Sequence, residues 1–309
     1  MNDNIAKKNT RLNKVSMPAE IIMHFILILF CLFCIVPFIF VIIISFTAEE
    51  SIRQIGFSFI PNKLSLQSYY YAFAMGGQLW QSYFNSFFVT IVGTALSVFI
   101  CILYSYALFR KDFKYRRFFT FFSFFTMLFG GGLIPTIVVM RQLLGLYDNY
   151  AALIVPLLVN PFNFIVMRTF FQSTVPTEII ESAQIDGSGE YGTLFKIIIP
   201  ISKPGIATIA LLNAIAYWNE WFIPMVLLAP NSKGLFTLQY MLYRMQAQVD
   251  FLARNAGNLG AEAATLIQNM PQQSLRMTLV VFVVLPIACA YPFFQQFIIS
   301  GLTIGSVKE

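Results

Sequence analysis

The sequence predicts an all-α integral membrane protein with six transmembrane helices. The 309-residue chain is 58% hydrophobic and 11% charged, whereas about a quarter of the residues in a soluble domain are charged. It also contains long runs without any charge, and about 20 apolar residues of helix cross a hydrocarbon core roughly 30 Å thick. Because lipid offers no partner to open backbone groups, such runs are expected to be helices.

Six segments have the length and apolar character of a span or come close to it. In chain order they are Ile21–Phe46, Asn85–Phe109, Phe118–Met140, Asn149–Met167, Gly205–Leu228 and Met277–Leu302. Pro156 and Pro161 interrupt the fourth, and Glu220 lies within the fifth. The first run is longer than a signal-peptide core and lacks a small-residue cleavage site, so we expect it to remain as a membrane helix.

The distribution of lysine and arginine predicts the orientation. With the N-terminus inside, the inner segments are 1–20, 110–117, 168–204 and 303–309, and they hold 13 of the 20 basic residues. We therefore expect both termini in the cytoplasm. The net charge of +6 follows from this topology, because a nucleic-acid partner would need a basic face with interleaved aromatics.

Polar stretches divide the chain into four parts. Residues 1–20 form a basic cytoplasmic tail, 21–81 the first helix with an outer loop, 82–300 the main transmembrane domain and 301–309 a second cytoplasmic tail. The main domain contains an inner segment at 176–200 and a polar outer loop at 230–276, in which we expect short helices.

The cysteines and the single histidine predict no metal or redox site. Cys31, Cys34, Cys101 and Cys289 all lie inside predicted spans. Cys31 and Cys34 form a C-x-x-C without a second pair or a histidine partner, so we interpret the cysteines as small buried hydrophobic residues. His24 lies where the first span meets the inner surface, and it fits interfacial packing better than ligation.

The inner segment "PTEIIESAQIDGSGEYGTLFKIIIP" predicts two short helices joined at a glycine. Pro176 suits a first helical turn, and Glu178 and Glu181 oppose the positive end of the helix. Gly187 is expected to end this helix in the left-handed conformation. A second amphipathic helix follows and is expected to end at Pro200.

The same segment favours docking to a soluble partner over a helix lying on lipid. Surface helices are usually rich in lysine and arginine. Here the charged residues are Glu178, Glu181, Asp186 and Glu190, against Lys196 alone. Anionic headgroups would repel these carboxylates, so we expect the apolar stripe of Ile179, Ile180 and Ala183 to enter a groove of a partner protein.

These residues resemble a loop of the permeases of binding-protein-dependent ABC importers. The matching positions in E-A-A-x-x-x-G-x9-I-x-L-P are Glu181, Ala183, Gly187, Ile197 and Pro200, with Ser182 and Ile199 as conservative departures. The stretch "VPTEIIESAQIDGSG" is similar to the carbohydrate-uptake branch. Further resemblances follow in order: "YFNSFFVT", "SYALFRKDFKYR", "GGGLIPTIVVMRQLLGLYDNYAALIVP", "YWNEWFIPM" and "YPFFQQFIISGLTIGSVKE". The last two are similar to permeases for complex oligo- and polysaccharides.

The resemblance implies the type I ABC importer permease (MetI-like) fold in the plasma membrane. It implies a second homologous permease, two cytoplasmic ATPases and an extracellular sugar-binding lipoprotein as partners. The residues that would couple to the ATPase are Glu178, Glu181, Ala183, Asp186, Gly187, Ile197 and Pro200, and the tail 301–309 would reach toward the ATPases. No lysine follows Gly or precedes Ser or Thr, so the chain has no P-loop. We therefore expect no enzyme activity and no cofactor here, with ATP and Mg²⁺ bound by the ATPases.

A second cluster lies in the fifth span and is predicted to form a sugar pathway. Its members are Tyr217, Trp218, Asn219, Glu220 and Trp221. Aromatic rings can stack on sugars, and an ionisable residue within a span indicates function. The alternative is that the tryptophans pack between helices and Glu220 pairs in the permease dimer. Fructo-oligosaccharide, pectin fragments and alginate fragments all fit as cargo, and we predict the first.

Two other classes of protein compete with this interpretation, a stand-alone secondary sugar transporter and a membrane scaffold. Secondary transporters usually show inverted repeats and paired intramembrane charges. Only Glu220 lies within the predicted spans, and no repeat is visible. A scaffold would need no acidic two-helix segment, so both alternatives are less consistent with the sequence.

Overall fold

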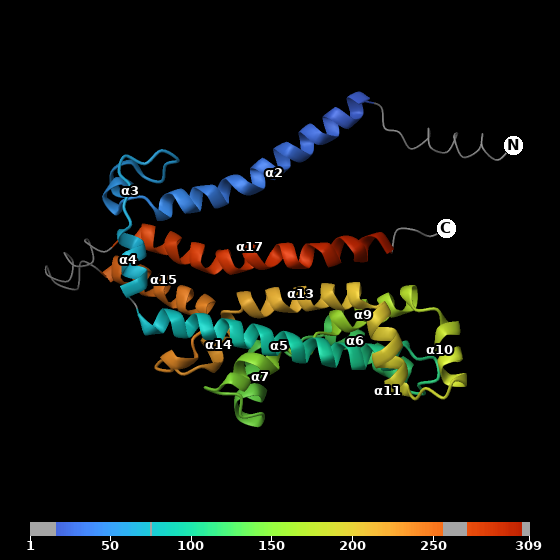
Figure 1. Cartoon of the computed structure of the whole chain (residues 1–309). Helices are drawn as coiled ribbons and strands as arrows, with labels where there is room; N and C mark the ends of the chain where they lie inside the picture. The colour runs from blue at the N-terminus through green and yellow to red at the C-terminus, as the bar shows by residue number, and fades with distance from the viewer. Residues whose placement is uncertain (1–16, 75, 256–270, 305–309) are drawn as a thin grey trace. The chain divides into compact units, whose positions relative to one another are not determined.

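A computed structural model describes residues 17–74, 76–255 and 271–304 (Figure 1). In these ranges the chain is mostly helical, and Thr47 and Leu64 form an isolated β-bridge. The chain divides into two compact units. One is made of Met1–Tyr71 with Pro271–Val281, and the other of Ala72–Met270 with Phe282–Glu309.

The first unit contains a long apolar helix and the segment that follows it. Its elements are α2 (Met17–Ser45), α3 (Glu49–Ile55), most of α4 (Gln67–Ala74) and the beginning of α17 (Gln272–Ile304). The Glu49 carboxylate accepts hydrogen bonds from the Gln273 and Ser274 amides at 3.1 and 3.0 Å. An acidic group at this position satisfies free amides and opposes the helix dipole, so it stabilises the start of α17.

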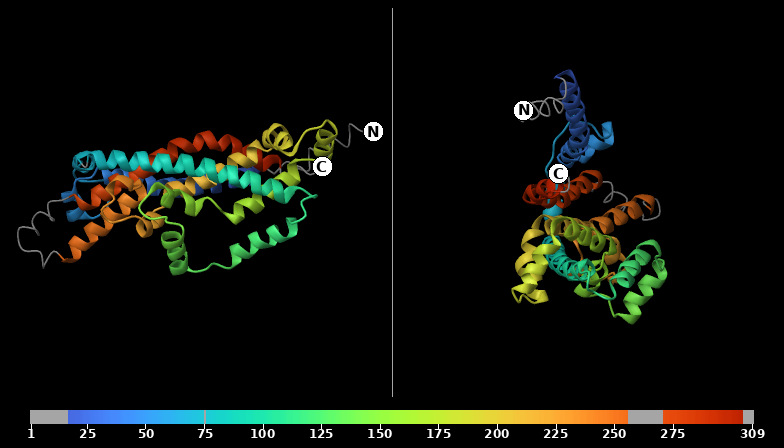
Figure 2. Two further views of the ribbon diagram at one scale, coloured as in Figure 1. Left: turned by 90° about the horizontal axis from the view of Figure 1, so that it is seen from below. Right: turned by 90° about the vertical axis from the view of Figure 1, so that its right-hand side faces the viewer.

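The second unit is built on α5, a helix of 33 residues. Its longer helices are α5 (Gly77–Phe109), α6 (Arg116–Leu128), α9 (Pro161–Thr174), α10 (Thr177–Ile185), α13 (Lys203–Asn219) and α15 (Leu238–Asn255). The shorter ones are α7 (Leu133–Val138), α8 (Tyr150–Ile154), α11 (Glu190–Thr193), α12 (Ile199–Ile201) and α14 (Phe222–Leu227). Both α9 and α13 pack along α5 (Figures 1 and 2).

Three of the predicted spans are continuous helices, and three are interrupted. The helices α2 and α5 and the stretch Gln272–Pro292 of α17 are each long and apolar enough to cross a membrane. Three bent pairs pass the same test only together: α6 with 133–143 at 116°, 150–157 with α9 at 50°, and 190–201 with α13 at 82°. By length and composition, the described residues therefore supply up to six spans, in agreement with the predicted fold class.

The fifth predicted span, Gly205–Leu228, is not one helix. The helix α13 ends at Asn219, and α14 begins at Phe222. Glu220 between them has an extended backbone with φ −74° and ψ 115°. Its carboxylate accepts hydrogen bonds from the Phe222 and Ile223 amides, both at 2.8 Å. These bonds satisfy the first amides of α14, so the charged residue starts a new helix instead of continuing the old one.

Buried polar residues join the helices of the second unit. The Asn85 amide group donates to the Gly234 and Phe236 carbonyls at 2.8 and 3.0 Å, and its oxygen accepts from the Tyr150 hydroxyl at 2.8 Å. Asn163 donates to Asn213 at 3.0 Å. Because buried polar groups are costly when unpaired, these bonds fix which helices pack together.

The cysteines differ from the prediction in their exposure. Cys101 is buried, whereas Cys31, Cys34 and Cys289 are exposed. The prediction of burial was wrong for these three, because α2 and that part of α17 present apolar side chains outward instead of into the chain's own core. His24 is also exposed and contacts the Glu20 carbonyl at 2.8 Å within its own helix.

Several predictions fall partly outside the described residues. The helix α17 continues to Ile304, but the end of the tail at 305–309 lies beyond the described residues, as do 1–16 of the N-terminal tail and 256–270 of the outer loop. The first part of that predicted outer loop contains α15. The loop is therefore helical there as expected, but α15 has 18 residues and is not one of the short helices that we predicted.

Candidate functional site

The first helix of the 176–200 segment, α10, ends as predicted at Gly187. Gly187 has φ +77°, a left-handed conformation that strains any residue with a Cβ. The Gly187 amide donates to the Gln184 carbonyl at 3.0 Å, and the Ser188 amide donates to the Ala183 carbonyl at 2.9 Å. This pair of bonds is a Schellman motif, which closes the helix C-terminus and fixes the direction of the chain that leaves it.

The second helix does not end at Pro200, so that prediction was wrong. After α11, residues Leu194–Ile198 form a π-helical turn, and α12 continues to Ile201. Pro200 lies at the start of that last turn, where its fixed φ is tolerated. The chain bends afterwards, because α13 begins at Lys203 and makes an angle of 82° with 190–201.

The predicted apolar stripe is divided between two faces. Ile180 and Ala183 are 6% and 7% exposed and turn toward the protein's own core, where Ile180 belongs to a cluster with Phe171, Leu194 and Ile198. Ala183 is therefore not available for docking. Ile197 is half-buried.

The outward face combines apolar side chains with carboxylates. Its apolar members are Ile179, Ile185, Tyr191 and Phe195, and Ile185 is 86% exposed. Its predicted polar members Glu178, Glu181 and Asp186 are exposed, as are Gly187 and Pro200. Among the described residues, none of these three carboxylates forms a salt bridge. We name these seven apolar and acidic side chains the outward face.

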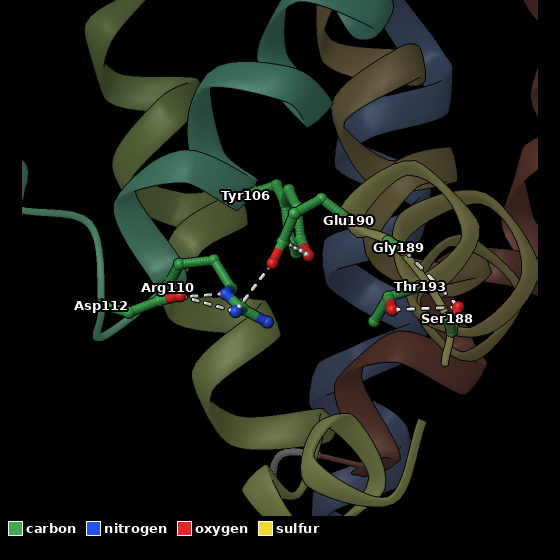
Figure 3. Close-up of polar contacts among 7 residues, drawn as sticks. All are labelled: Tyr106, Arg110, Asp112, Ser188, Gly189, Glu190 and Thr193. Atoms are coloured by element: carbon green, nitrogen blue, oxygen red, sulfur yellow. Dashed lines mark hydrogen bonds and ion pairs between the residues drawn. The ribbon is translucent and has the colours of Figure 1, made fainter. Parts of the chain in front are cut away.

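A cluster of charged and aromatic groups fastens this segment to the end of α5 (Figure 3). Arg110 lies 2.9 Å from one Glu190 carboxylate oxygen and 2.7 Å from an Asp112 oxygen. The Tyr106 hydroxyl donates to the other Glu190 oxygen at 2.5 Å. We name these four residues the Arg110 clamp.

The electrostatics of the Arg110 clamp favour its charged form. Hydrogen bonding from Arg110 lowers the pKa of Asp112, and the same bond raises the pKa of Arg110. The Arg110 side chain is 10% exposed, whereas that of Glu190 is 54% exposed. The clamp thus joins a shielded cation on α5 to a more open carboxylate on α11.

The clamp was missed at the sequence level. Glu190 stands out in the sequence only as one of four acidic residues in the inner segment, and Tyr106 and Arg110 only as part of the stretch "SYALFRKDFKYR". A signal was present, because Tyr106 and Arg110 are four residues apart and so share one face of a helix. Their partner lies 84 residues from Tyr106, a separation that no local pattern reveals.

The second predicted cluster separates into packed and accessible members. Tyr217 and Trp218 are buried. The Tyr217 hydroxyl donates to the Ile154 carbonyl at 2.8 Å, and the Trp218 ring nitrogen donates to the Val283 carbonyl at 3.1 Å. Both fit the packing alternative.

Asn219 and Trp221 remain accessible in this cluster. The Asn219 oxygen accepts from Gln239 at 3.0 Å. Trp221 is 39% exposed and stacks on Tyr243 with ring centroids 4.5 Å apart. Among the described residues, no group of three or more His, Cys, Asp or Glu side chains could hold a metal ion.

Residues 98–303 match the family described as "Binding-protein-dependent transport system inner membrane component". The chain belongs to this family. The match contains α9 to α15 together with the whole 176–200 segment and both predicted clusters. Tyr106 and Arg110 of the Arg110 clamp lie within the matched residues as well.

Individual relatives cover nearly the whole chain. The polygalacturonan/rhamnogalacturonan transport system permease protein YtcP of Bacillus subtilis (strain 168) is 37% identical over 289 residues, which cover 94% of this permease and 98% of the relative. Protein LplC of the same organism is 38% identical over 276 residues, 89% of each chain. A crystal structure of a bacterial ABC transporter involved in the import of the acidic polysaccharide alginate matches with a TM-score of 0.76 and 29% identity, covering 92% of this permease and 98% of that chain.

Proposed function

We propose that this permease forms one half of the transmembrane pore of an ATP-driven importer of acidic oligosaccharides. In this proposal the 176–200 segment docks into a groove of a cytoplasmic ATPase. The observation that carries it is the outward face, where a highly exposed isoleucine lies among unpaired carboxylates on a segment fastened to α5. A soluble partner would bury the apolar groups and pair the charges.

Partners and topology follow from the same proposal. A second homologous permease completes the pore, two ATPases bind the inner side together with ATP and Mg²⁺, and an extracellular lipoprotein delivers the cargo. The Arg110 clamp, the outward face and both termini then lie in the cytoplasm, as the distribution of basic residues indicates. A stand-alone secondary transporter would need its own energy coupling, and the family match does not favour it.

The proposed cargo is an oligosaccharide that contains uronic acids. The relative YtcP is named as a permease of polygalacturonan/rhamnogalacturonan transport, and the structural relative is involved in the import of alginate. These are acidic polysaccharides, so they support pectin or alginate fragments over the predicted fructo-oligosaccharide. We place a contact with the sugar at Trp221 and Asn219, because the stacked Trp221–Tyr243 pair is accessible whereas Tyr217 and Trp218 are committed to packing.

The docking proposal is tested with two isoleucines of similar exposure. Ile185 and Ile60 are 86% and 82% exposed, so neither Ile185→Asp nor Ile60→Asp should disturb folding. We expect I185D to reduce recovery of the ATPase with the permease pair by tenfold or more, because it places a charge in the buried centre of the interface. I60D should behave like the wild type. Equal recovery with I185D and the wild type would contradict docking through this face.

The cargo is tested separately on the complete importer in liposomes. Oligogalacturonides and oligoalginates are expected to stimulate ATP hydrolysis in the presence of the cognate binding protein, and a fructo-oligosaccharide is not. Stimulation by the fructo-oligosaccharide alone would contradict the acidic cargo and leave the docking proposal untouched.

A further inference from the structure

A basic cavity lies at the start of α6, apart from both sites described above. Its volume is about 680 Å³. The lining residues come from the 111–114 loop, α6 and α9, and they are Lys111, Phe113, Lys114, Arg116, Arg117, Thr120, Phe121, Phe124 and Arg168. We name it the α6 cavity.

The charged residues that line the α6 cavity are all positive. Five of its lining residues are lysine or arginine, and none is acidic. The nearby carboxylate of Asp112 is bound to Arg110 instead. Arg116 and Arg168 act on each other as like charges. A cluster of this kind favours an anion, and the positive end of α6, a 13-residue helix, adds to the attraction.

Two polar atoms in the wall of the cavity have no partner. The Arg168 Nε and the Thr120 Oγ1 are buried without a hydrogen bond among the described residues. An N–H and an O–H left unpaired in a protein interior are costly. A ligand with several acceptor oxygens, such as a phosphate group, would satisfy both donors after their side chains rotate toward the cavity, because neither atom is open to solvent in this structure.

The other wall of the cavity is apolar and open. Phe121 and Phe124 belong to α6 and are 68% and 44% exposed. Both rings follow Arg116 and Arg117 along α6. A ligand whose phosphate group lies at the start of α6 would therefore place an attached hydrocarbon chain beside the two rings. A free phosphate or a nucleotide would leave this wall uncovered, whereas a phospholipid carries a charged head and an acyl chain in this order.

We propose that the α6 cavity binds the headgroup of an anionic phospholipid, with its acyl chain lying against Phe121 and Phe124. Lys114 and Arg117 contribute open cations, and Arg168 donates from within. The lipid would stabilise a group of like charges at the junction of α6 and α9. This site is independent of the outward face and of the cargo.

The test uses the complete importer in nanodiscs of phosphatidylcholine with or without phosphatidylglycerol. Lipids retained after extraction are measured by native mass spectrometry. The variant Lys114→Gln with Arg117→Gln removes two exposed charges from the cavity. The matched control is Lys196→Gln with Lys203→Gln. These two lysines are exposed and lie on the same proposed side of the membrane, but they do not line the α6 cavity.

We expect the wild type and the control to retain phosphatidylglycerol selectively, and the cavity variant to retain it about 10- to 30-fold less tightly. Arg168→Gln should weaken retention as well, and an unchanged thermal midpoint of the purified permease will show that each variant is folded. Equal retention by the cavity variant and the control would overturn the proposal. Full displacement of the lipid by millimolar inorganic phosphate would also overturn it, because the site would then recognise the anion without the acyl chain.

Discussion

Arg110 links the end of α5 to the 176–200 segment. It is the residue that follows the last turn of α5, and it contacts Glu190 across the clamp at 2.9 Å. The downward pKa shift of Asp112 means that its pairing with Arg110 persists at neutral pH and is lost only as the pH falls through that lowered pKa. The Arg110–Asp112 pair is therefore constant over the physiological range.

The variant Glu190→Gln tests the Arg110 clamp. It keeps an acceptor for Tyr106 but removes the charge opposite Arg110. Because the Glu190 side chain is half exposed, the pair contributes modestly, and we expect a two- to fivefold loss of cargo-stimulated ATPase activity with assembly preserved. Asp112→Asn is the control, since it leaves the Glu190 contact intact. Equal losses in both variants would show that the Glu190 contact has no special part in coupling.

Gly93 permits the close approach of α5 and α13. A Cβ at this position would lie 2.5 Å from the Tyr217 ring, and that ring is held by the bond from its hydroxyl to Ile154. Gly93→Ala is therefore expected to lower the free energy of unfolding by about 1–3 kcal/mol. Gly189→Ala is the control, because a Cβ there meets nothing within 4 Å. The measurement is the thermal midpoint of the purified permease in detergent.

Single residues were predictable from the sequence where a local rule governs them. The left-handed Gly187 follows from helix termination. Asn85 and Arg110 were not predictable, because their roles depend on partners that adjoin them only after folding. Asn85 pairs with a carbonyl 151 residues away, and the stretch "YFNSFFVT" carries no local signal for that partner.

The two helices of the 176–200 segment act as one element only if the joint at Gly187 keeps its angle. Val cannot easily adopt φ +77°. We expect Gly187→Val to weaken ATPase recovery by the permease pair about tenfold without changing membrane insertion, and Glu181→Ala to weaken it by a similar factor through loss of a charge-assisted hydrogen bond.

Gly189→Val is the matched control for this joint. Gly189 has an ordinary φ of −72° and open space around it. If Gly187→Val and Glu181→Ala both retain normal assembly and stimulation, the 176–200 segment is not the coupling element.

At the level of elements, the length of an apolar run predicted the three continuous helices correctly, but it did not predict where the other spans are interrupted. The helices α2, α5 and α17 agree with uninterrupted runs. The third span is divided after α6, where Gly130–Gly132 give no helical support, and the fifth is divided where Glu220 caps α14. Periodicity located the apolar stripe on α10, but it could not tell which member faces the core, because that depends on α9 and the π-helical turn packed behind it.

At the scale of the whole molecule, the chain has the features of a subunit. Its first long helix, α2, is apolar, and none of the 18-residue stretch that qualifies as a span is buried. An apolar surface of this length is covered by lipid or by protein when the permease is in the membrane. The outward face and the α6 cavity also expose groups that a complete assembly would pair.

The last prediction concerns the chain by itself. Purified alone in liposomes, this permease is expected to show neither ATP hydrolysis nor cargo uptake, because no P-loop is present in the sequence. Adding the second permease and the ATPases should restore ATP hydrolysis, and adding the binding protein should make it respond to the cargo. ATP hydrolysis after this addition shows that the purified permease is folded, because a denatured chain would not assemble into an active importer. Uptake by the lone chain, driven by an ion gradient, would instead identify a secondary transporter. It would contradict the proposed energy coupling, because a subunit that depends on ATPases cannot concentrate a sugar without them.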